Sequence, residues 1–207
     1  MYFVTDLRPD LGGLLAAALA GGVDMVQLRD KRADDSELLR GAEVFRRLCD
    51  ERGALFWLND RPDLVERCGA DGVHVGQDDM PVADVRAAVG PDVLVGLSTH
   101  SPAQLAAALS SGADQLSAGP VYETPTKEGR PATGLEYVRH AASLAGGRPW
   151  FAIGGIDLDN VRDVVAAGAR RIVVVRAIRD ADDPRAAAAA LRAVLERGGP
   201  GGEEDQP

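Results

Sequence analysis

Polar side chains with distinct chemistry alternate in the short segment 27–31 of this 207-residue chain. Gln27, Arg29 and Lys31 are two residues apart, so an extended backbone would point all three to the same side. Two cations beside an amide donor are suited to binding a phosphate or diphosphate group. A solvated ion-pair cluster that includes Asp30 is the alternative for this segment.

Further carboxylates come soon after apolar runs, near positions where strands are expected to end. Asp60 follows the run 55–58, and Asp78 and Asp79 follow the next apolar segment along the chain. Mg²⁺ prefers a few carboxylates together with phosphate oxygens and water, so these positions predict a site for a Mg²⁺-diphosphate complex. Helix N-capping is the alternative for each aspartate, and we favour capping or exposure only for Asp78. Asp60 and Asp79 are the metal-ligand candidates.

Hydroxyl groups follow the later apolar runs. In the segment 96–101, Ser98 is the candidate for substrate contact, because Ser101 precedes Pro102 and is expected to cap a helix. The segment 119–131 is rich in Thr, Pro, Gly and Lys, a combination that suits a mobile lid closing over an anion. An ordinary exposed loop is the alternative for this segment.

The last two apolar runs lead into possible phosphate-binding loops. Gly154 and Gly155 permit close backbone approach, and Val175 and Arg176 follow the final run. Loops of this kind commonly bind phosphate through backbone amides at helix N-termini. Many unrelated proteins share the feature, so it favours a phosphorylated substrate without identifying one.

The histidines and cysteines form no recognisable catalytic or metal-binding motif. His74 lies within an apolar run, which favours a hydrogen-bonded core or supporting residue over a general base. His100 and His140 are weaker candidates still, so no histidine is assigned to catalysis. Cys49 and Cys68 lack the paired spacing of zinc sites and are expected to be buried thiols.

The elements that would position these residues alternate along the chain. β-branched runs alternate with Ala/Leu-rich amphipathic stretches, a pattern typical of βαβ units and a parallel sheet. We expect strands at 2–5, 24–29, 54–58, 71–75, 93–97, 114–118, 149–153 and 171–175. The clearest helical stretches are 36–51, 102–111, 157–167 and 184–197. Eight such units predict an α/β fold, a single-domain (β/α)₈ TIM barrel over 1–197, with the active site at the carboxyl ends of its strands.

A weak internal repeat supports a closed barrel over an open doubly wound sheet. The tripeptides Gly22-Val23-Asp24, Gly69-Ala70-Asp71, Gly112-Ala113-Asp114 and Gly168-Ala169-Arg170 stand between expected helices and strands 2, 4, 6 and 8. Each glycine fits a helix C-terminus with positive φ. The acidic, Gly- and Pro-containing tail 198–207 is expected to be disordered.

The composition excludes several functional classes. The chain is 45% hydrophobic and 27% charged, and none of its apolar runs approaches the roughly 20 residues of a membrane span. A net charge of -9 disfavours nonspecific nucleic-acid binding, because the average field of the protein repels a polyanion. Met1 leads directly into the strand-like segment 2–5 with no room for a secretory signal, so we expect a cytoplasmic protein.

Taken in order, these segments resemble the thiamine phosphate synthase family from the first expected strand to the last. The matching pieces are VQLRDK at 26–31, LNDRPDL at 58–64, DGVHVGQDDMP at 71–81, GLSTHS at 96–101, GPVYETPTKEGRPATGLEYVR at 119–139, AIGGID at 152–157 and VVVRAI at 173–178. Apart from the long central piece, each is weak alone. Their joint order and spacing carry the resemblance.

The resemblance implies a transferase of thiamine biosynthesis that condenses 4-amino-2-methyl-5-hydroxymethylpyrimidine diphosphate with 4-methyl-5-(2-phosphoethyl)-thiazole or its carboxylated form. The products would be thiamine phosphate and pyrophosphate, released through a dissociative mechanism assisted by one Mg²⁺ per subunit. Catalysis would rest on Arg29, Lys31, Ser98 and Lys127. The pyrimidine-diphosphate site further matches Gln27, Leu28, Asp30 and Asn59, and the Mg²⁺ ligands match Asp60 and Asp79. The thiazole-phosphate site matches Thr124, Pro125, Thr126, Gly155, Val175 and, least firmly, Arg176.

Two other functions stay open beside the synthase. A thiazole tautomerase is a related barrel that lacks the full diphosphate site and uses a histidine near the loop after strand 6, where this chain has Pro120 and Tyr122. A catalytically silent phosphate-binding barrel is the second alternative. We expect small-molecule partners, no nucleic acid and no membrane, with a homo-oligomer possible.

Overall fold

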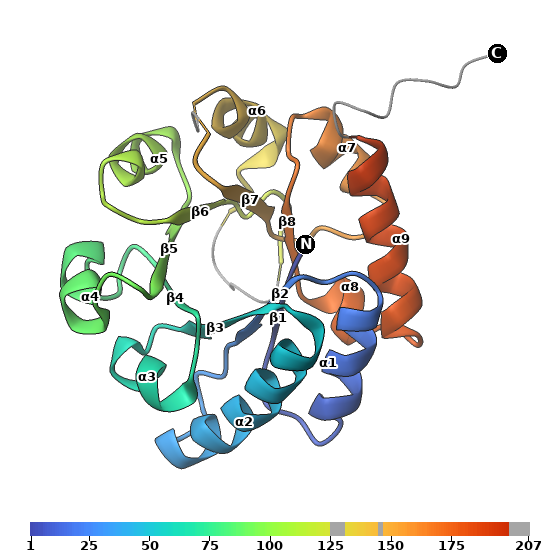
Figure 1. Ribbon diagram of the computed structural model, residues 1–207. Helices are drawn as coiled ribbons and strands as arrows, with labels where there is room; N and C mark the ends of the chain where they lie inside the picture. Colours follow the sequence, from blue (N-terminus) through green and yellow to red (C-terminus); the bar gives the residue numbers. More distant parts are fainter. Residues whose placement is uncertain (125–130, 145–146, 199–207) are drawn as a thin grey trace.

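The computed structural model describes residues 1–124, 131–144 and 147–198 and forms a closed barrel of eight parallel strands (Figure 1). The strands pair in chain order, and β1 closes the barrel against β8. They are β1 Tyr2–Thr5, β2 Met25–Leu28, β3 Leu55–Asn59, β4 Gly72–Val75, β5 Leu94–Thr99, β6 Gln115–Ala118, β7 Trp150–Ile153 and β8 Ile172–Val174. The predicted single-domain (β/α)₈ barrel is therefore confirmed, and the open sheet is wrong.

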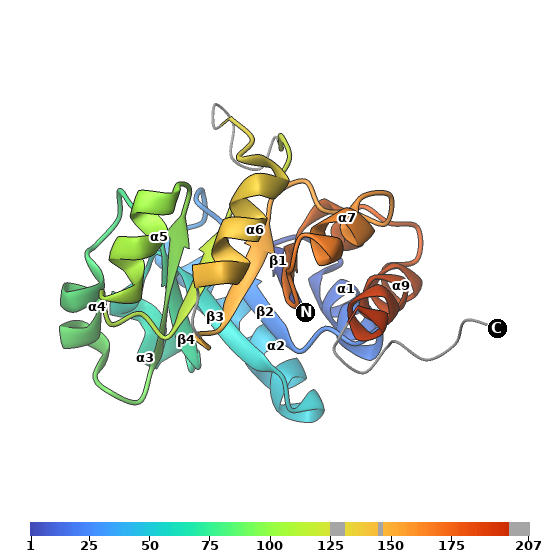
Figure 2. The ribbon, with the colours of Figure 1, turned by 90° about the horizontal axis from the view of Figure 1, so that it is seen from above.

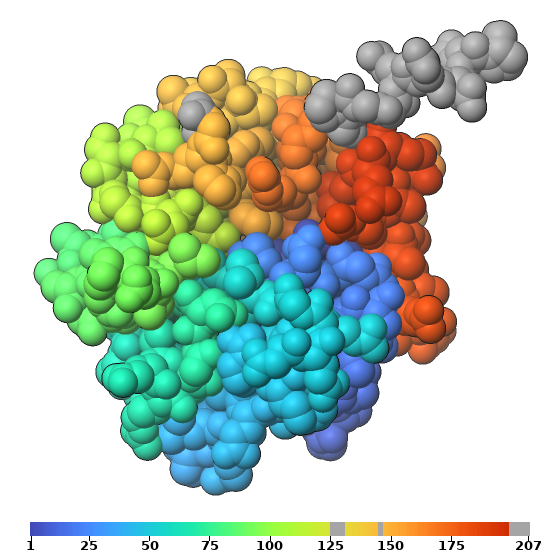
Figure 3. Space-filling model, in the orientation of Figure 1, coloured from blue at the N-terminus to red at the C-terminus, as the bar shows by residue number. Residues whose placement is uncertain are grey.

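A ring of helices surrounds the strands. The helices are α1 Leu11–Ala20, α2 Asp35–Arg52, the 3₁₀ turn η1 Pro62–Leu64, α3 Val65–Cys68, α4 Val82–Val89, α5 Pro102–Leu109, α6 Gly134–Leu144, α7 Val161–Ala166, α8 Arg176–Arg179 and α9 Pro184–Arg197. Figure 3 shows the blue N-terminal segment beside the orange-red segment that contains α9, in agreement with the packing of α1 against α9. None of the described helices is both long and apolar enough to cross a membrane.

Two predicted element boundaries differ from the structure. β5 runs on to Thr99 instead of ending at 97, because its last residues still pair with β6. α7 begins at Val161 instead of 157, because a turn precedes it: the Asp157 backbone N–H donates to Asn160 Oδ1 at 3.1 Å. The remaining strand and helix ranges agree with the expected ones within about two residues.

The strands separate two hydrophobic cores. Side chains on one face of each strand pack against the surrounding helices, and those on the other face fill the barrel interior. The interior cluster lies toward the amino ends of the strands and consists of Tyr2, Val4, Met25, Trp57, Phe151 and Val173. The Tyr2 ring contacts Phe151 edge-on, with centroids 5.5 Å apart. This packed cluster fills the amino end of the described barrel interior, and a cavity lies toward the carboxyl ends.

The glycine junctions predicted from the repeat have the expected geometry. Gly22, Gly69, Gly112 and Gly168 all adopt positive φ, between 64° and 108°. Two residues after Gly69, Asp71 links the amino ends of two neighbouring strands. It directly precedes β4, and its Oδ2 accepts from the backbone N–H of Phe56 in β3 at 2.7 Å and pairs with Arg46 at 3.0 Å. The repeat thus stabilises the barrel at the amino ends of its strands. The carboxyl ends are left available for a site.

Candidate functional site

A cavity of about 350 Å³ lies at the carboxyl ends of the strands and reaches into the barrel interior. Most of the predicted site residues line it, namely Gln27, Arg29, Lys31, Asn59, Asp60, Asp79, Ser98, Thr124, Gly155, Val175 and Arg176. In Figure 2, the described chain on either side of 125–130 projects from one end of the barrel. The predicted residues Pro125, Thr126 and Lys127 lie outside the described residues, as do the rest of the segment 125–130 of the predicted lid and the tail beyond Gly198.

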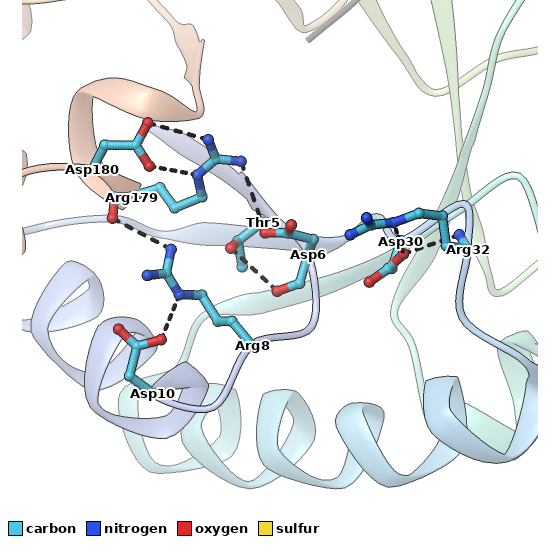
Figure 4. Close-up of polar contacts among 8 residues, drawn as sticks. All are labelled: Thr5, Asp6, Arg8, Asp10, Asp30, Arg32, Arg179 and Asp180. Carbon is cyan, nitrogen blue, oxygen red and sulfur yellow. Dashed lines mark hydrogen bonds and ion pairs between the residues drawn. The ribbon is translucent and has the colours of Figure 1, made fainter.

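Two predicted substrate-binding residues are not brought to the cavity. Leu28 is fully buried in the outer core, because alternation along β2 turns it away from Gln27 and Arg29. Asp30 accepts a hydrogen bond from the Arg32 backbone N–H at 3.0 Å and does not line the cavity (Figure 4). Their side chains therefore do not belong to the cavity wall, although both lie in the segment that suggested the site.

Two carboxylates and one ammonium group meet at the rim. Asp60 Oδ2 lies 3.1 Å from Lys31 Nζ, and Asp79 lies beside Asp60. Burial raises the pKa of Asp60, the Lys31 hydrogen bond opposes this, and the negative charge of Asp79 adds to the rise. Asp60 also adopts φ 61°, a conformation uncommon outside glycine, Asn and Asp. Such an observed outlier at a charged rim is typical of a functional position.

The carboxylate pair fits a hard divalent cation. Asp79 is held by its own loop, because Oδ2 accepts from the Gly76 backbone N–H at 2.7 Å. A Cβ added at Gly76 would stand 2.9 Å from that oxygen, so glycine leaves the aspartate its place. No cluster of three or more metal-binding side chains occurs in the described part of the chain. Two carboxylates are nevertheless enough for Mg²⁺, because phosphate and water oxygens commonly complete its coordination shell.

A buried polar network lies deeper in the cavity. His74 Nε2 is 3.0 Å from Ser98 Oγ, and Ser117 Oγ lies 3.4 Å from the same hydroxyl. The Gln77 side chain donates to the Ser98 backbone carbonyl at 2.6 Å, which fixes the end of β5. The prediction that His74 is hydrogen-bonded is confirmed, and the structure adds that its ring lines the cavity. These contacts hold the Ser98 side chain in the wall of the cavity.

At the bottom of the cavity, Tyr2 meets a carboxamide from another strand. Its hydroxyl accepts a hydrogen bond from Gln27 Nε2 at 2.5 Å, and both residues are at most 3% exposed. Burial raises the pKa of Tyr2, and hydrogen bonds with Gln27 and Gln115 act in the opposite direction. Tyr2 was not among the predicted site residues, because an aromatic residue in a strand is usually part of the hydrophobic core.

The loops after β6 and β7 hold each other in place. The backbone N–H groups of Val121 and Tyr122 donate to the carbonyls of Ile153 and Gly154 at 2.8 and 3.0 Å. Gly155 adopts φ 64°, and a Cβ there would lie 2.7 Å from Tyr122 Cβ. Glycine is therefore required for this close approach, which sets the wall of the cavity beside Thr124.

The short helix α8 forms another part of the wall, and residues that follow β1 hold its last residue in place (Figure 4). Arg179 makes two hydrogen bonds to Asp180, at 2.7 and 3.1 Å, and pairs with Asp6 at 3.8 Å. Arg8 donates to the Arg179 carbonyl at 3.5 Å. Since Asp6 and Arg8 follow β1 and α8 follows β8, these contacts join the first and last strand–helix units of the barrel beside the cavity. The hydrogen bonds from Arg179 also lower the pKa of Asp180, which lines the cavity.

Sequence reasoning missed several residues of the cavity wall. They include Tyr2, Val4, His74, His100, Ser117, Pro120, Ile153, Ile156, Asp157, Val173, Ala177 and Asp180. His100 had been set aside, yet its Nδ1 lies 2.6 Å from the Gly119 carbonyl. The available signal was strand alternation: Val4, Ser117, Ile153 and Val173 occupy interior positions of their strands.

Comparison with known proteins agrees with this geometry. A family model described as thiamine monophosphate synthase matches residues 1–178. The chain is 53% identical over 192 residues to a thiamine-phosphate synthase of Streptomyces avermitilis, covering 91% of this chain and 89% of that protein. It is 53% identical over 205 residues to the one of Saccharopolyspora erythraea, covering 94% and 92%.

A solved structure extends the agreement to three dimensions. Thiamine phosphate pyrophosphorylase from Pyrococcus furiosus superposes with a TM-score of 0.86 at 34% identity, and the match covers 95% of this chain and 96% of that one. The residues that the family model matches include all eight strands of the barrel. The chain therefore belongs to the thiamine monophosphate synthase family, a family of TIM-barrel transferases.

Proposed function

We propose that the chain joins 4-amino-2-methyl-5-hydroxymethylpyrimidine diphosphate to 4-methyl-5-(2-phosphoethyl)-thiazole, or its carboxylated form, and releases pyrophosphate. One observation carries the proposal: Arg29, Lys31, Asp60 and Asp79 converge from three strand ends on the rim of one cavity. Cations beside a carboxylate pair suit a diphosphate and its metal ion. The related proteins named above support the same reaction class.

The cavity has two chemical zones that match the two parts of a pyrimidine diphosphate. Its deep part is formed by Val4, Ile153 and Val173, which suit a flat aromatic ring. The deep part also holds the hydrogen-bonding groups of Gln27 and Ser98, which suit the ring nitrogens and their substituents. The ring would therefore enter first and leave the diphosphate among the charged residues of the rim.

The bond change requires no protein nucleophile. The bond between the pyrimidine methylene carbon and the diphosphate oxygen breaks, and both electrons leave with the diphosphate. The lone pair of the thiazole nitrogen then forms the new carbon–nitrogen bond. Arg29 and Lys31 stabilise the charge that develops on the leaving group, and the cavity walls hold the two reactants in line.

Asp60 and Asp79 would hold Mg²⁺, which when bound supplies further positive charge to the diphosphate. Lys31 already contacts Asp60, so its ammonium group offsets one of the two carboxylate charges and leaves a net negative charge that would attract the cation. The thiazole phosphate would lie on the other side of the cavity, against Thr124, Gly155 and Val175. Backbone N–H groups and Arg176 there suit a phosphate group.

Turnover with defined substrates tests the proposal. The full chain is incubated with both substrates and Mg²⁺, and thiamine phosphate and pyrophosphate are measured together. We expect the two products in equal amounts, with no product when either substrate or the metal is omitted. Binding of both substrates without product would instead favour a silent phosphate-binding barrel. Isomerisation of the thiazole carboxylate alone would favour the tautomerase. A cytoplasmic location, a homo-oligomer and the absence of nucleic-acid binding stay predictions.

A further inference from the structure

The Tyr2 hydroxyl lies where side chains from two other strands meet inside the barrel. Tyr2 belongs to β1, Gln27 to β2 and Gln115 to β6, and all three are at most 5% exposed. Gln27 Nε2 donates to the Tyr2 hydroxyl at 2.5 Å, and Gln115 hydrogen-bonds to the same group. Gly96 makes room for this arrangement, since a Cβ there would lie 3.1 Å from Gln115 Nε2.

The contact with Tyr2 determines which atom of Gln27 faces a ligand. A carboxamide has two donor hydrogens on its nitrogen and an acceptor oxygen at its other end. Because the nitrogen is engaged by Tyr2 and Gln27 lines the cavity, the oxygen is the end left for the ligand. The cavity therefore presents a hydrogen-bond acceptor at this point of its wall.

We propose that Tyr2 is a positioning residue: its hydroxyl fixes the Gln27 carboxamide so that the site selects a pyrimidine with an amino group over one with an oxo group. An exocyclic amino group donates to Gln27 Oε1, whereas an oxo group places two acceptors against each other in a buried site. A site built around one hydrogen bond strongly rejects an analogue that cannot make it. The inference rests on the proposed function, because it assigns the deep part of the cavity to the pyrimidine ring.

The primary test is the Tyr2→Phe variant, which keeps the ring and removes only the hydroxyl. Calorimetry with Mg²⁺ measures binding of the 4-amino pyrimidine diphosphate and of its 4-oxo analogue. We expect the wild type to prefer the amino compound at least about tenfold, and the variant to lose about tenfold of that preference. The KM of the thiazole phosphate should stay within about twofold, as that substrate lies elsewhere in the cavity. An unchanged preference, or a wild type that does not discriminate, overturns the proposal.

Trp57→Phe is the matched control for packing. Trp57 touches the Tyr2 ring, with centroids 6.1 Å apart, belongs to the same interior cluster and does not line the cavity. Its Nε1 makes no hydrogen bond within the described part of the chain, so this change disturbs packing alone. The amino-to-oxo preference should survive in Trp57→Phe. A loss as large as that of Tyr2→Phe would mean that general loosening explains both, and would refute a positioning role.

A second background separates orientation from every other effect of Tyr2. In Gln27→Glu both terminal atoms are acceptors, so turning the group over changes nothing for the ligand. Tyr2→Phe should therefore leave the preference unaltered in the Gln27→Glu background, and a further loss there contradicts the proposal. If Tyr2→Phe does not fold, Gln27→Glu alone decides. Its added charge repels the diphosphate that both ligands carry, so a retained preference supports an acceptor at this point, and a lost preference excludes it.

Failure of this inference differs visibly from failure of the proposed function. If the wild type forms thiamine phosphate and Tyr2→Phe keeps the full preference, only the positioning role of Tyr2 is refuted. If the wild type discriminates between the two pyrimidines as expected but forms no product, only the proposed condensation reaction is refuted.

Discussion

Replacing Asp60 with asparagine tests the charge arrangement at the rim. The change removes one negative charge, keeps the shape of the side chain and suits the local backbone. Asp60 has φ 61°, and Asn is among the few residues that tolerate this conformation, whereas Ala would add strain. A loss of activity in Asp60→Asn can therefore be attributed to the charge.

The structure predicts a small change in stability and a large change in rate. Lys31 is 58% exposed, so its ion pair with Asp60 contributes about 0–1 kcal/mol. Removing a half-buried charge next to Asp79 offsets part of that loss, so Tm should move by no more than about 4 °C. Losing one charged group that supports the leaving diphosphate should lower kcat/KM by about 10²- to 10³-fold, or about 3–4 kcal/mol.

Two assays check these values. Steady-state kinetics with both substrates gives kcat/KM, and thermal unfolding with Mg²⁺ and pyrophosphate gives the stabilisation by ligands. At about 100 times Kd, ligands stabilise the wild type by about 2.7 kcal/mol, and Asp60→Asn should lose most of this. Asp78→Asn is the control, since it makes the same chemical change at an exposed neighbour of the site that does not line the cavity. Wild-type kcat/KM in Asp60→Asn, or an equal loss in Asp78→Asn, would refute the reasoning.

Two further substitutions and one labelling experiment probe the cavity wall and the core. Arg179→Ala, which breaks the bidentate contact to Asp180, should raise the KM of the thiazole phosphate several-fold while that of the pyrimidine stays within about twofold; equal rises in steady-state assays would contradict the clamp. Gly155→Ala forces a Cβ against Tyr122 at φ 64°, so Tm should fall by an amount equivalent to about 1–2 kcal/mol and thiazole binding should weaken, whereas an unchanged Tm would show that the loop adapts. Burial raises the pKa of Cys49 to about 12. At pH 8, its reaction with an aromatic disulfide reagent should therefore be roughly a thousandfold slower in the folded chain than in the unfolded chain. Rapid labelling of the folded chain would disprove the burial of this thiol.

Much of the fold follows from local sequence signals. β-branched runs and positive-φ glycines such as Gly69 give the strand count and the junctions, because both reflect backbone sterics. α8 was not predicted, since four residues are too few to show a helical period. The late start of α7 depends on a side chain of Asn160 competing for backbone N–H groups, which periodicity does not register.

The rim of the site was predictable where alternation was applied residue by residue. Gln27, Arg29 and Lys31 line the cavity as their spacing predicts. Leu28 and Asp30 were included because the whole segment matched a family motif, and alternation alone would have pointed both away. A motif therefore locates a segment, and the period of the strand decides which of its side chains reach a ligand.

Polar residues inside the barrel were harder to interpret, because both faces of every strand are buried when helices surround the sheet. His74, Ser98 and Ser117 stand in apolar strands and had no predicted partner, yet they contact one another across β4, β5 and β6. Each buried polar group left unsatisfied would cost about 1–3 kcal/mol, so such residues persist inside a core where partners or a ligand satisfy them. Since Gln27 and Tyr2 follow the same rule in the deep part of the cavity, interior polarity in a helix-covered barrel is itself evidence for a binding site.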